Sequence, residues 1–185
     1  MSWSTSEWSV RGVKVGPECF IGEGCRFYPP GVVELKRRAR IDPGVHCTVA
    51  LMMDENSVIC SGAKLTGGGL VVMKRWTFVG YLSQIHTSTE KYRTSLVNAW
   101  WGETECDRGP VVFEDYSGVA SNVIVLPGVT FPEGCAVGAG GLVTSGRDLR
   151  PWWIHLGSPA KPWKERDRER ILAQERREGF LRHHE

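Results

Sequence analysis

Apolar residues recur at every sixth position over two long stretches of this sequence, 41–71 and 113–143. Only 41% of the chain is hydrophobic, so an unbroken series in both stretches is not an accident of composition. We call these positions anchors. They are Ile41, Cys47, Met53, Ile59, Leu65 and Val71, then Phe113, Val119, Val125, Phe131, Val137 and Val143; Val15, Ile21 and Phe27 keep the same spacing upstream, and Met73, Val79 and Ile85 resume it after a slip of two residues.

A second position, four residues after each anchor, usually holds a small residue. Val45, Leu51, Val123 and Val129 are among the larger exceptions. Small residues at a fixed offset indicate a crowded inward site, where cysteine serves as a compact apolar side chain rather than as a reactive thiol. The small residues are Cys19, Cys25, Gly31, Ser57, Ala63, Gly69, Ser83, Ser117, Cys135 and Gly141.

A period of six fits a short strand followed by a turn, and it does not fit an α-helix. Three such units form one coil of about 18 residues, and coils stack by parallel strand pairing, each burying a face of its neighbour. The Gly and Pro residues of the stretch "VLPGVTFPEGCAVGAGGLV" (125–143) then fall at the corners of a three-sided column. The pattern therefore predicts an all-β protein, a parallel β-helix of about five to six coils.

The rhythm stops after Ile85 and resumes at Phe113. A coil cannot absorb the intervening residues, so 86–110 is predicted to protrude as a loop, and long loops in compact domains are often functional. The segment 161–185 is rich in charge and is predicted to be a helical tail that opens at Pro162. We expect this tail to pack on the β-helix domain (1–160) and to cover its open end, where strand edges are unpaired.

The six-residue repeat, together with "VGAGGLVTSG" (137–146) and "IHLGSPAKPWKER" (154–166), resembles the left-handed β-helix (hexapeptide-repeat) acyltransferases, nearest to bacterial sugar O- and N-acetyltransferases. The resemblance covers residues 13–166 and implies the left-handed coil. It also implies acetyl-CoA as co-substrate, a sugar or nucleotide-linked sugar as acceptor, a role in cell-surface polysaccharide synthesis, and a homotrimer with each active site between two subunits.

Transfer of an acetyl group needs a base, and an imidazole is suitable because it titrates near neutral pH. His86 opens the protruding loop and is the first candidate. The resembled O-acetyltransferases carry a His-Pro pair here, whereas this chain reads "IHTSTEKY" (85–92), closer to some N-acetyltransferases of nucleotide aminosugars. Glu90 is therefore the second catalytic candidate, and the choice between O- and N-transfer stays open.

The resemblance also places the binding sites. Coenzyme A is expected at coil corners formed by Ala120, Ser121, Gly138 and Ala139, where glycine allows close approach to the backbone. Three basic side chains, Lys161, Lys164 and Arg166, are expected to meet its phosphates. The loop residues Tyr92, Asn98, Trp100 and Trp101 are expected to contact the acceptor or a neighbouring subunit.

Composition limits the alternatives. The chain has 185 residues and a net charge of +2, which excludes a strongly basic nucleic-acid binder. It shows neither an apolar run long enough to span a membrane nor a secretory signal, so we expect a cytoplasmic protein. With six cysteines but no CxxC pair, no metal is expected. Two other functions are considered: an enzyme like the γ-class carbonic anhydrases, which needs three converging histidines, and a scaffold that has lost activity.

Overall fold

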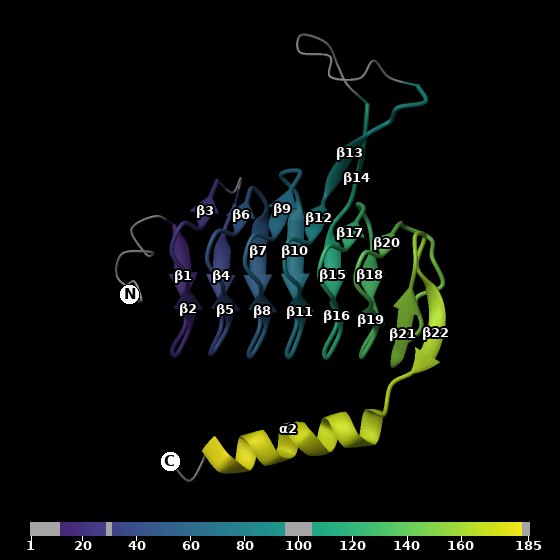
Figure 1. The fold of residues 1–185 in the computed structure, drawn as a ribbon. Helices are drawn as coiled ribbons and strands as arrows, with labels where there is room; N and C mark the ends of the chain where they lie inside the picture. The colour runs from purple at the N-terminus through teal and green to yellow at the C-terminus, as the bar shows by residue number, and fades with distance from the viewer. Residues whose placement is uncertain (1–11, 29–30, 95–104, 183–185) are drawn as a thin grey trace.

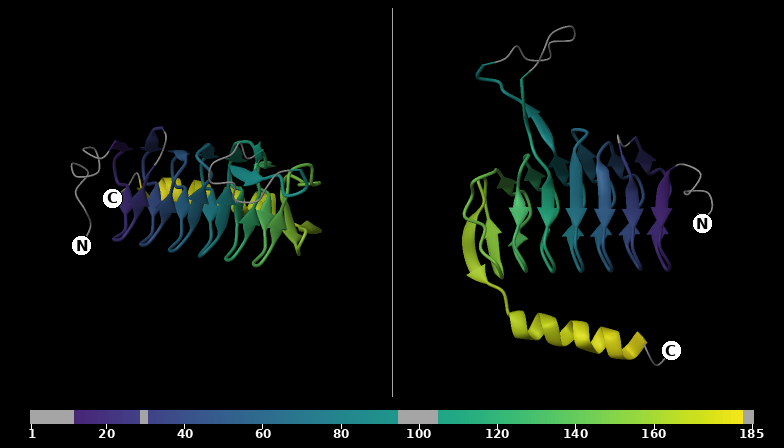
Figure 2. Two further views of the ribbon diagram at one scale, coloured as in Figure 1. Left: turned by 90° about the horizontal axis from the view of Figure 1, so that it is seen from above. Right: turned by 180° about the vertical axis from the view of Figure 1, so that it is seen from behind.

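The computed structural model describes residues 12–28, 31–94 and 105–182, and it is a parallel β-helix with one long α-helix (Figure 1). Each of the first six coils contributes one short strand to each of three sheets, A, B and C, and the coils stack in a line (Figure 2). We call this three-sided column the prism. Its strands pair in parallel over two to four residues, as in Val71↔Leu51 and Val71↔Val111.

The strands recur in a fixed order along the chain. Sheet A contains β1 (Val13–Val15), β4 (Val33–Leu35), β7 (Ala50–Met53), β10 (Leu70–Met73), β15 (Val111–Phe113) and β18 (Thr130–Phe131). Sheet B contains β2 (Phe20–Ile21), β5 (Arg40–Ile41), β8 (Val58–Ile59), β11 (Phe78–Val79), β16 (Gly118–Val119), β19 (Ala136–Val137), β21 (Trp153–Leu156) and β22 (Lys161–Glu165). Sheet C contains β3 (Arg26–Phe27), β6 (His46–Cys47), β9 (Lys64–Thr66), β12 (Gln84–His86), β17 (Ile124–Val125) and β20 (Leu142–Val143).

The predicted anchors form the core. All twelve anchors of the two main runs are at most 2% exposed, and they line the inside of the prism together with small inward residues such as Ser57 and Cys135. Phe113 and Phe131, on neighbouring coils, stack with ring centroids 4.5 Å apart. All six cysteines are free thiols, and burial raises the pKa of the Cys135 thiol to about 12. The structural interpretation of Cys135 as an inert core residue follows from this environment.

The prism is longer than the five to six coils predicted, because β21 adds a strand of a seventh coil to sheet B. His155 occupies the anchor position of that coil, in register with Val137. Its ring is fully buried: Nε2 accepts the backbone N–H of Arg150 at 3.0 Å, so Nδ1 carries the proton and faces the carbonyl oxygen of Ala136 at 3.3 Å. Because this anchor position holds a polar residue, the apolar periodicity of the sequence does not reveal the seventh coil.

The tail differs from its prediction in two ways. Pro162 lies in β22, which pairs antiparallel with β21, and the helix α2 (Arg168–Arg182) begins only at Arg168. The helix does not cover the end of the prism. It runs back along the side of the coils, on the side opposite the protruding loop (Figures 1 and 2). The last edge of sheet B is covered by β22 instead.

The predicted loop begins as a two-stranded arm. β13 (Ser88–Glu90) pairs antiparallel with β14 (Cys106–Arg108), and the arm projects away from the prism (Figure 1). Lys91 lies 3.8 Å from Glu105 and 3.9 Å from Asp107, which adds exposed ion pairs across the two strands. We use the name arm for residues 87–110.

Candidate active site

His86 is the last residue of β12, where the chain leaves sheet C to enter the arm. It points outward from the prism, because its neighbour Ile85 fills the core, and it is half-buried at the root of the arm. Its ring nitrogen Nδ1 lies 3.0 Å from the hydroxyl oxygen of Thr66, which is opposite His86 on the preceding coil. One ring nitrogen is thus engaged by the prism and the other points away from Thr66.

Burial lowers the pKa of His86 below its ordinary value, since desolvation penalises the imidazolium form. A histidine with a lowered pKa is neutral at physiological pH. A neutral imidazole can accept a proton, so the environment of His86 suits a general base.

The arm carries the other catalytic candidate. Glu90 ends β13, is half-buried and stands opposite Cys106 in the hairpin. Tyr92 follows it and is 69% exposed, so its ring is available to a ligand or a second subunit. Asn98, Trp100 and Trp101 lie outside the described residues.

The four predicted coenzyme contacts do come together. They lie at the corner between sheets B and C, which we call the glycine corner and define by Gly80, Ala120, Ser121, Gly138 and Ala139. These residues stack on successive coils: the N–H of Gly140 donates to the carbonyl oxygen of Ser121 at 3.0 Å, and the N–H of Gly138 donates to that of His155 at 2.9 Å.

The backbones at this corner are close together. A Cβ atom on Gly80 would lie 2.4 Å from the carbonyl carbon of Ala120, and one on Gly138 would lie 2.3 Å from Cδ2 of Leu156. At position 80 a larger residue would clash with the backbone of Ala120, so glycine is required there. At position 138 a Cβ atom would clash with the side chain of Leu156, which can move. A corner without bulky side chains exposes backbone groups that a ligand can reach.

The three basic residues near the last coil do not act as one group. Lys161 and Lys164 are exposed on β22, and Lys161 stands opposite Leu156, whose side chain covers Gly138. Arg166 instead lies at the corner between sheets A and B, where its guanidinium donates to the carbonyl oxygens of Tyr116 (2.8 Å) and Gly134 (2.6 Å). Of the three, Lys161 is thus the one near the glycine corner, whereas Lys164 stands opposite Ile154, farther back along β21.

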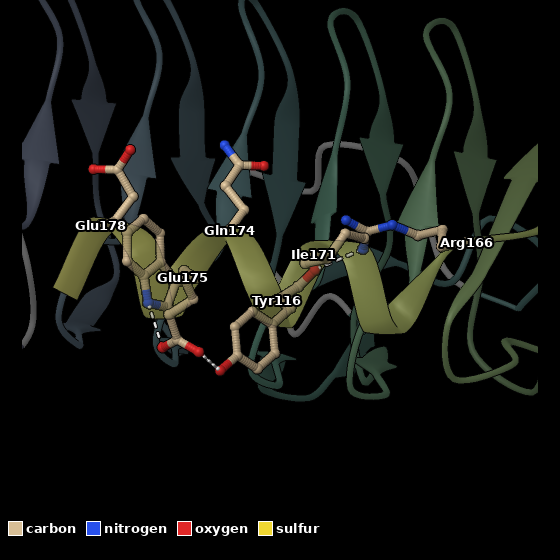
Figure 3. Close-up of a pocket in the computed structure, with 7 residues that line it drawn as sticks. Tyr116, Arg166, Ile171, Gln174, Glu175 and Glu178 are labelled. Atoms are coloured by element: carbon tan, nitrogen blue, oxygen red, sulfur yellow. Dashed lines mark hydrogen bonds between the residues drawn. The ribbon is translucent and has the colours of Figure 1, made fainter. Parts of the chain in front are cut away.

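A separate pocket of about 250 Å³ lies between α2 and the corner of sheets A and B (Figure 3). Glu175 of the helix accepts hydrogen bonds from Trp76 Nε1 at 2.8 Å and from the Tyr116 hydroxyl at 2.5 Å. At the start of the helix, the guanidinium of Arg168 lies 5.3 Å from the Trp152 ring. Side chains thus tie α2 to successive coils, and His86 lies at a different corner of the prism.

Thr66 is the site residue that the sequence analysis missed. It follows the anchor Leu65 and precedes three glycines, Gly67–Gly69, so the sequence suggests a turn residue. The feature that could have revealed it is the separation of 20 residues between Thr66 and His86, which equals one coil plus two extra residues. Among the described residues no group of three or more His, Cys, Asp or Glu side chains could hold a metal ion, so the carbonic-anhydrase alternative has no ligand set there.

No family model matches the chain. Two curated proteins match short segments. A Schizosaccharomyces pombe protein named as an acetyltransferase is 43% identical over 60 residues, which is 32% of this chain and 28% of that protein. A Staphylococcus aureus protein named in the same way is 38% identical over 61 residues, 33% of this chain and 30% of its own length. The chain thus spans less than a third of the curated relatives it matches.

Solved structures match along almost the whole chain. AntD, an N-acyltransferase from Bacillus cereus in complex with dTDP and 3-hydroxybutyryl-CoA, has a TM-score of 0.85 and 22% identity over 98% of both chains. An AntD mutant in complex with dTDP-4-amino-4,6-dideoxyglucose and coenzyme A has a TM-score of 0.82 and 21% identity over 98% of this chain and 97% of that one. The hexapeptide-repeat acetyltransferase VCA0836 from Vibrio cholerae has a TM-score of 0.61 and 18% identity over 89% and 82%.

The class that these matches define is the hexapeptide-repeat fold of the acyltransferases. This chain has that fold, with the arm and a C-terminal helix added to the prism. None of the helices described is long and apolar enough to cross a membrane.

Proposed function

We propose that the protein is an acetyl-CoA-dependent acyltransferase that acylates the amino group of a nucleotide-linked sugar. The observation that carries the proposal is His86: a half-buried imidazole with a lowered pKa, bonded to Thr66 and placed at the root of the arm. Support comes from AntD, which shares the fold and binds a dTDP-aminosugar and coenzyme A. The sequence "IHTSTEKY", which lacks the His-Pro pair, also favours transfer to nitrogen.

In this mechanism the acceptor nitrogen attacks the thioester carbonyl carbon. His86 takes the proton that the nitrogen loses and then donates it to the sulfur, so that the carbon–sulfur bond breaks and coenzyme A leaves as the thiol. The low pKa of His86 keeps its imidazole neutral and ready to accept that proton. Glu90, half-buried on the arm beside this region, is proposed to bind the amino group or to act as the base in place of His86.

The coenzyme is proposed to lie along the glycine corner. The N–H groups of Ala120 and Gly138 and the carbonyl of Ser121 already bond within the prism. The proposed contacts to the pantetheine arm are therefore the other backbone groups of Ser121, Gly138 and Ala139, with Ala120 packing beside them. Lys161 and Lys164 offer positive charge to the phosphates. We leave Arg166 out of this site, because its guanidinium is already bonded to two backbone carbonyls.

The acceptor is proposed to approach over sheet C. Four outward side chains of sheet C stand in register on successive coils. They begin the strands β3, β6, β9 and β12 and are Arg26, His46, Lys64 and Gln84. They are basic or neutral, which suits the diphosphate of a nucleotide-linked sugar. Tyr92, Asn98, Trp100 and Trp101 remain predicted contacts for the sugar or the nucleotide base.

The complete site is proposed to need more than one subunit, as in a homotrimer. The glycine corner precedes the strands of sheet C and His86 ends one of them, so the two are about 10 Å apart along the strand direction. A neighbouring prism can close this gap. Sheet A supports association, because it exposes Met52 and Leu70 beside the half-buried Val72 and Val112 on adjacent strands.

The cellular setting is an extension of the same proposal. Acetyl-CoA and nucleotide-linked sugars are expected to meet in the cytoplasm, and cell-surface polysaccharide synthesis is the role that the resemblance to sugar acetyltransferases implies.

The proposal is tested by incubating the purified protein with acetyl-CoA and a panel of nucleotide-linked sugars, with and without an amino group, and measuring the thiol released. With the best acceptor, His86→Ala is expected to lower kcat at least tenfold and to leave the affinity for coenzyme A nearly unchanged. Absence of thiol release with every acceptor would contradict the proposed activity. Full turnover by the His86→Ala variant would remove His86 as the base.

A further inference from the structure

The hydrogen bond between Thr66 and His86 joins two coils. Their strands pair in register, His86 of β12 opposite Thr66 of β9, and the hydroxyl oxygen lies 3.0 Å from Nδ1. Only Nδ1 faces the prism in this arrangement, so Nε2 is the nitrogen that can meet a substrate. If Nδ1–H of a neutral imidazole donates this bond, Nε2 has a lone pair. If the Thr66 hydroxyl donates it, Nε2 carries the proton.

The backbone under both side chains is held by Thr87, which is 1% exposed. Its hydroxyl donates to the carbonyl oxygen of Thr66 at 3.0 Å and accepts the N–H of Gly69 at 2.9 Å, and its own N–H donates to the same Thr66 carbonyl at 2.8 Å. These three bonds fasten the turn after Thr66 to the residue after His86.

Two glycines of that turn allow this close packing. A Cβ atom on Gly67 would lie 2.5 Å from the backbone nitrogen of Ser88, and one on Gly69 would lie 2.8 Å from Cβ of Thr87. The turn therefore closes directly onto the root of the arm, and the relative position of Thr66 and His86 is fixed by the surrounding structure rather than by flexible side chains.

We propose that Thr66 is a positioning residue for His86. Its hydroxyl oxygen accepts the Nδ1–H of the imidazole, which leaves the lone pair of Nε2 free to take the acceptor's proton. When that proton arrives, the imidazolium retains its Nδ1–H bond to Thr66, and a bond from a charged donor is stronger than one from a neutral donor. This inference rests on the proposed function for its catalytic part, but the tautomer of His86 is a property of the protein alone.

The first test is therefore independent of activity. Long-range proton–nitrogen NMR correlations of the ¹⁵N-histidine protein, assigned by comparison with His86→Ala, report which ring nitrogen of His86 carries the proton. The Nδ1–H tautomer is expected in the wild type, and a shift toward the Nε2–H tautomer is expected in Thr66→Val, which keeps the shape but removes the hydroxyl. An Nε2–H tautomer in the wild type overturns the inference, even if Thr66→Val does not fold.

The second test uses turnover. Thr66→Val is expected to lower kcat about tenfold with little change in the KM for acetyl-CoA, and Thr66→Ser, which restores the hydroxyl, is expected to recover most of the loss. Ser145→Ala, which removes a hydroxyl group at an exposed corner, serves as the control and is expected to change neither quantity. If His86→Ala is impaired while Thr66→Val keeps full kcat, Thr66 does not position the base. If the tautomer is as expected but His86→Ala is fully active, His86 is not the base and the catalytic part of the inference fails, whereas the proposed activity fails only if no acceptor releases thiol.

Discussion

Individual residues near the last coil differ in their partners. Lys161 is exposed on β22 and Arg166 is bonded to the carbonyl oxygens of Tyr116 and Gly134, although both follow the same "GSPA" stretch (157–160). An exposed ammonium group can bind a phosphate without affecting the fold. A guanidinium that satisfies half-buried carbonyls contributes to stability, because its removal leaves those carbonyls without donors.

Substitution of the two residues should therefore separate binding from stability. Lys161→Met is expected to weaken coenzyme A binding about tenfold and to leave the free energy of unfolding unchanged. Arg166→Met is expected to lower the free energy of unfolding by about 2 kcal/mol. Calorimetric titration with coenzyme A and urea denaturation measure the two effects. The reverse pattern would mean that Arg166 binds the phosphates and Lys161 does not.

Two glycines of the glycine corner allow an equally direct comparison. Gly80→Ala is expected to lower the free energy of unfolding by about 1–3 kcal/mol, because its Cβ would meet the backbone of Ala120 and Ser121. Gly138→Ala is expected to cost less than about 1 kcal/mol, because its Cβ would meet only Cδ2 of Leu156, the far end of a flexible side chain. Urea denaturation of both variants checks the order. Equal losses would show that the coils can shift apart at Gly80.

At the scale of elements, α2 is held to the prism by side chains rather than by backbone pairing. Glu175 bonds to Trp76 and Tyr116, which lie on successive coils at the same corner (Figure 3). Burial first, and the hydrogen bond to Glu175 second, together raise the pKa of Tyr116 to about 12. The phenol is therefore harder to ionise in the folded protein than in the unfolded chain, whose tyrosines titrate near 10.

This difference predicts a pH dependence of stability. Between about pH 10 and pH 12 the unfolded chain loses the Tyr116 proton while the folded protein keeps it, so the contribution of Tyr116 to stability is complete below pH 10 and declines as pH rises to about 12. Glu175→Gln is expected to lower the pKa of Tyr116 toward 10. Phenolate absorbance during alkaline titration measures it, with Tyr116→Phe identifying the late component. Superimposable titrations of wild type and Glu175→Gln would exclude the contact in solution.

The arm is the element whose place in the site is best defined at its root. Thr87 and the glycines of the turn 67–69 fix where it leaves the prism, and its ion pairs, such as Lys91 with Glu105, are exposed. Exposed ion pairs add little stability. The root is thus held by the hydrogen bonds of the buried Thr87, and the strands beyond it by the antiparallel pairing of β13 with β14.

At the scale of the whole molecule, sheet A presents an outward apolar surface over adjacent coils, formed by Met52, Leu70, Val72 and Val112. An exposed apolar surface of this kind marks a contact site. We expect it to bury against a second subunit and thereby to bring the glycine corner of one prism near the His86 of another.

Val72→Glu is accordingly expected to dissociate the oligomer and to reduce turnover, because it places a charge in the proposed interface without reaching the core. Sedimentation velocity measures the oligomeric state. Ser145→Glu, which adds the same charge at an exposed corner, is the control and should leave the state unchanged. An unaltered sedimentation coefficient for Val72→Glu would place the interface on another face.

The anchors predict much of the fold, since every anchor of the two main runs, 41–71 and 113–143, is buried as expected. The last coil was missed because His155 replaces an apolar anchor, and the helix was placed too early because Pro162 also fits the first residue of a helix. Of the candidate site, the sequence pointed to His86 and to four residues of the glycine corner, which stay predictions, but it did not point to Thr66. Its role depends on a partner that the two extra residues of its coil bring into register.

The sequence alone determines the cross-section of the molecule, because a repeat of six residues is a local rule: each short strand and turn forms from neighbours in the chain. The tertiary structure decides which residues of neighbouring coils lie against each other. Stacking brings together residues 20 apart, such as Thr66 and His86, or 40 apart, such as Arg75 and Asp115, and it turns α2 along the side of the prism. These contacts depend on where the extra residues of a coil are accommodated. Strand pairing between neighbouring coils decides this, and it acts only when the coils are stacked.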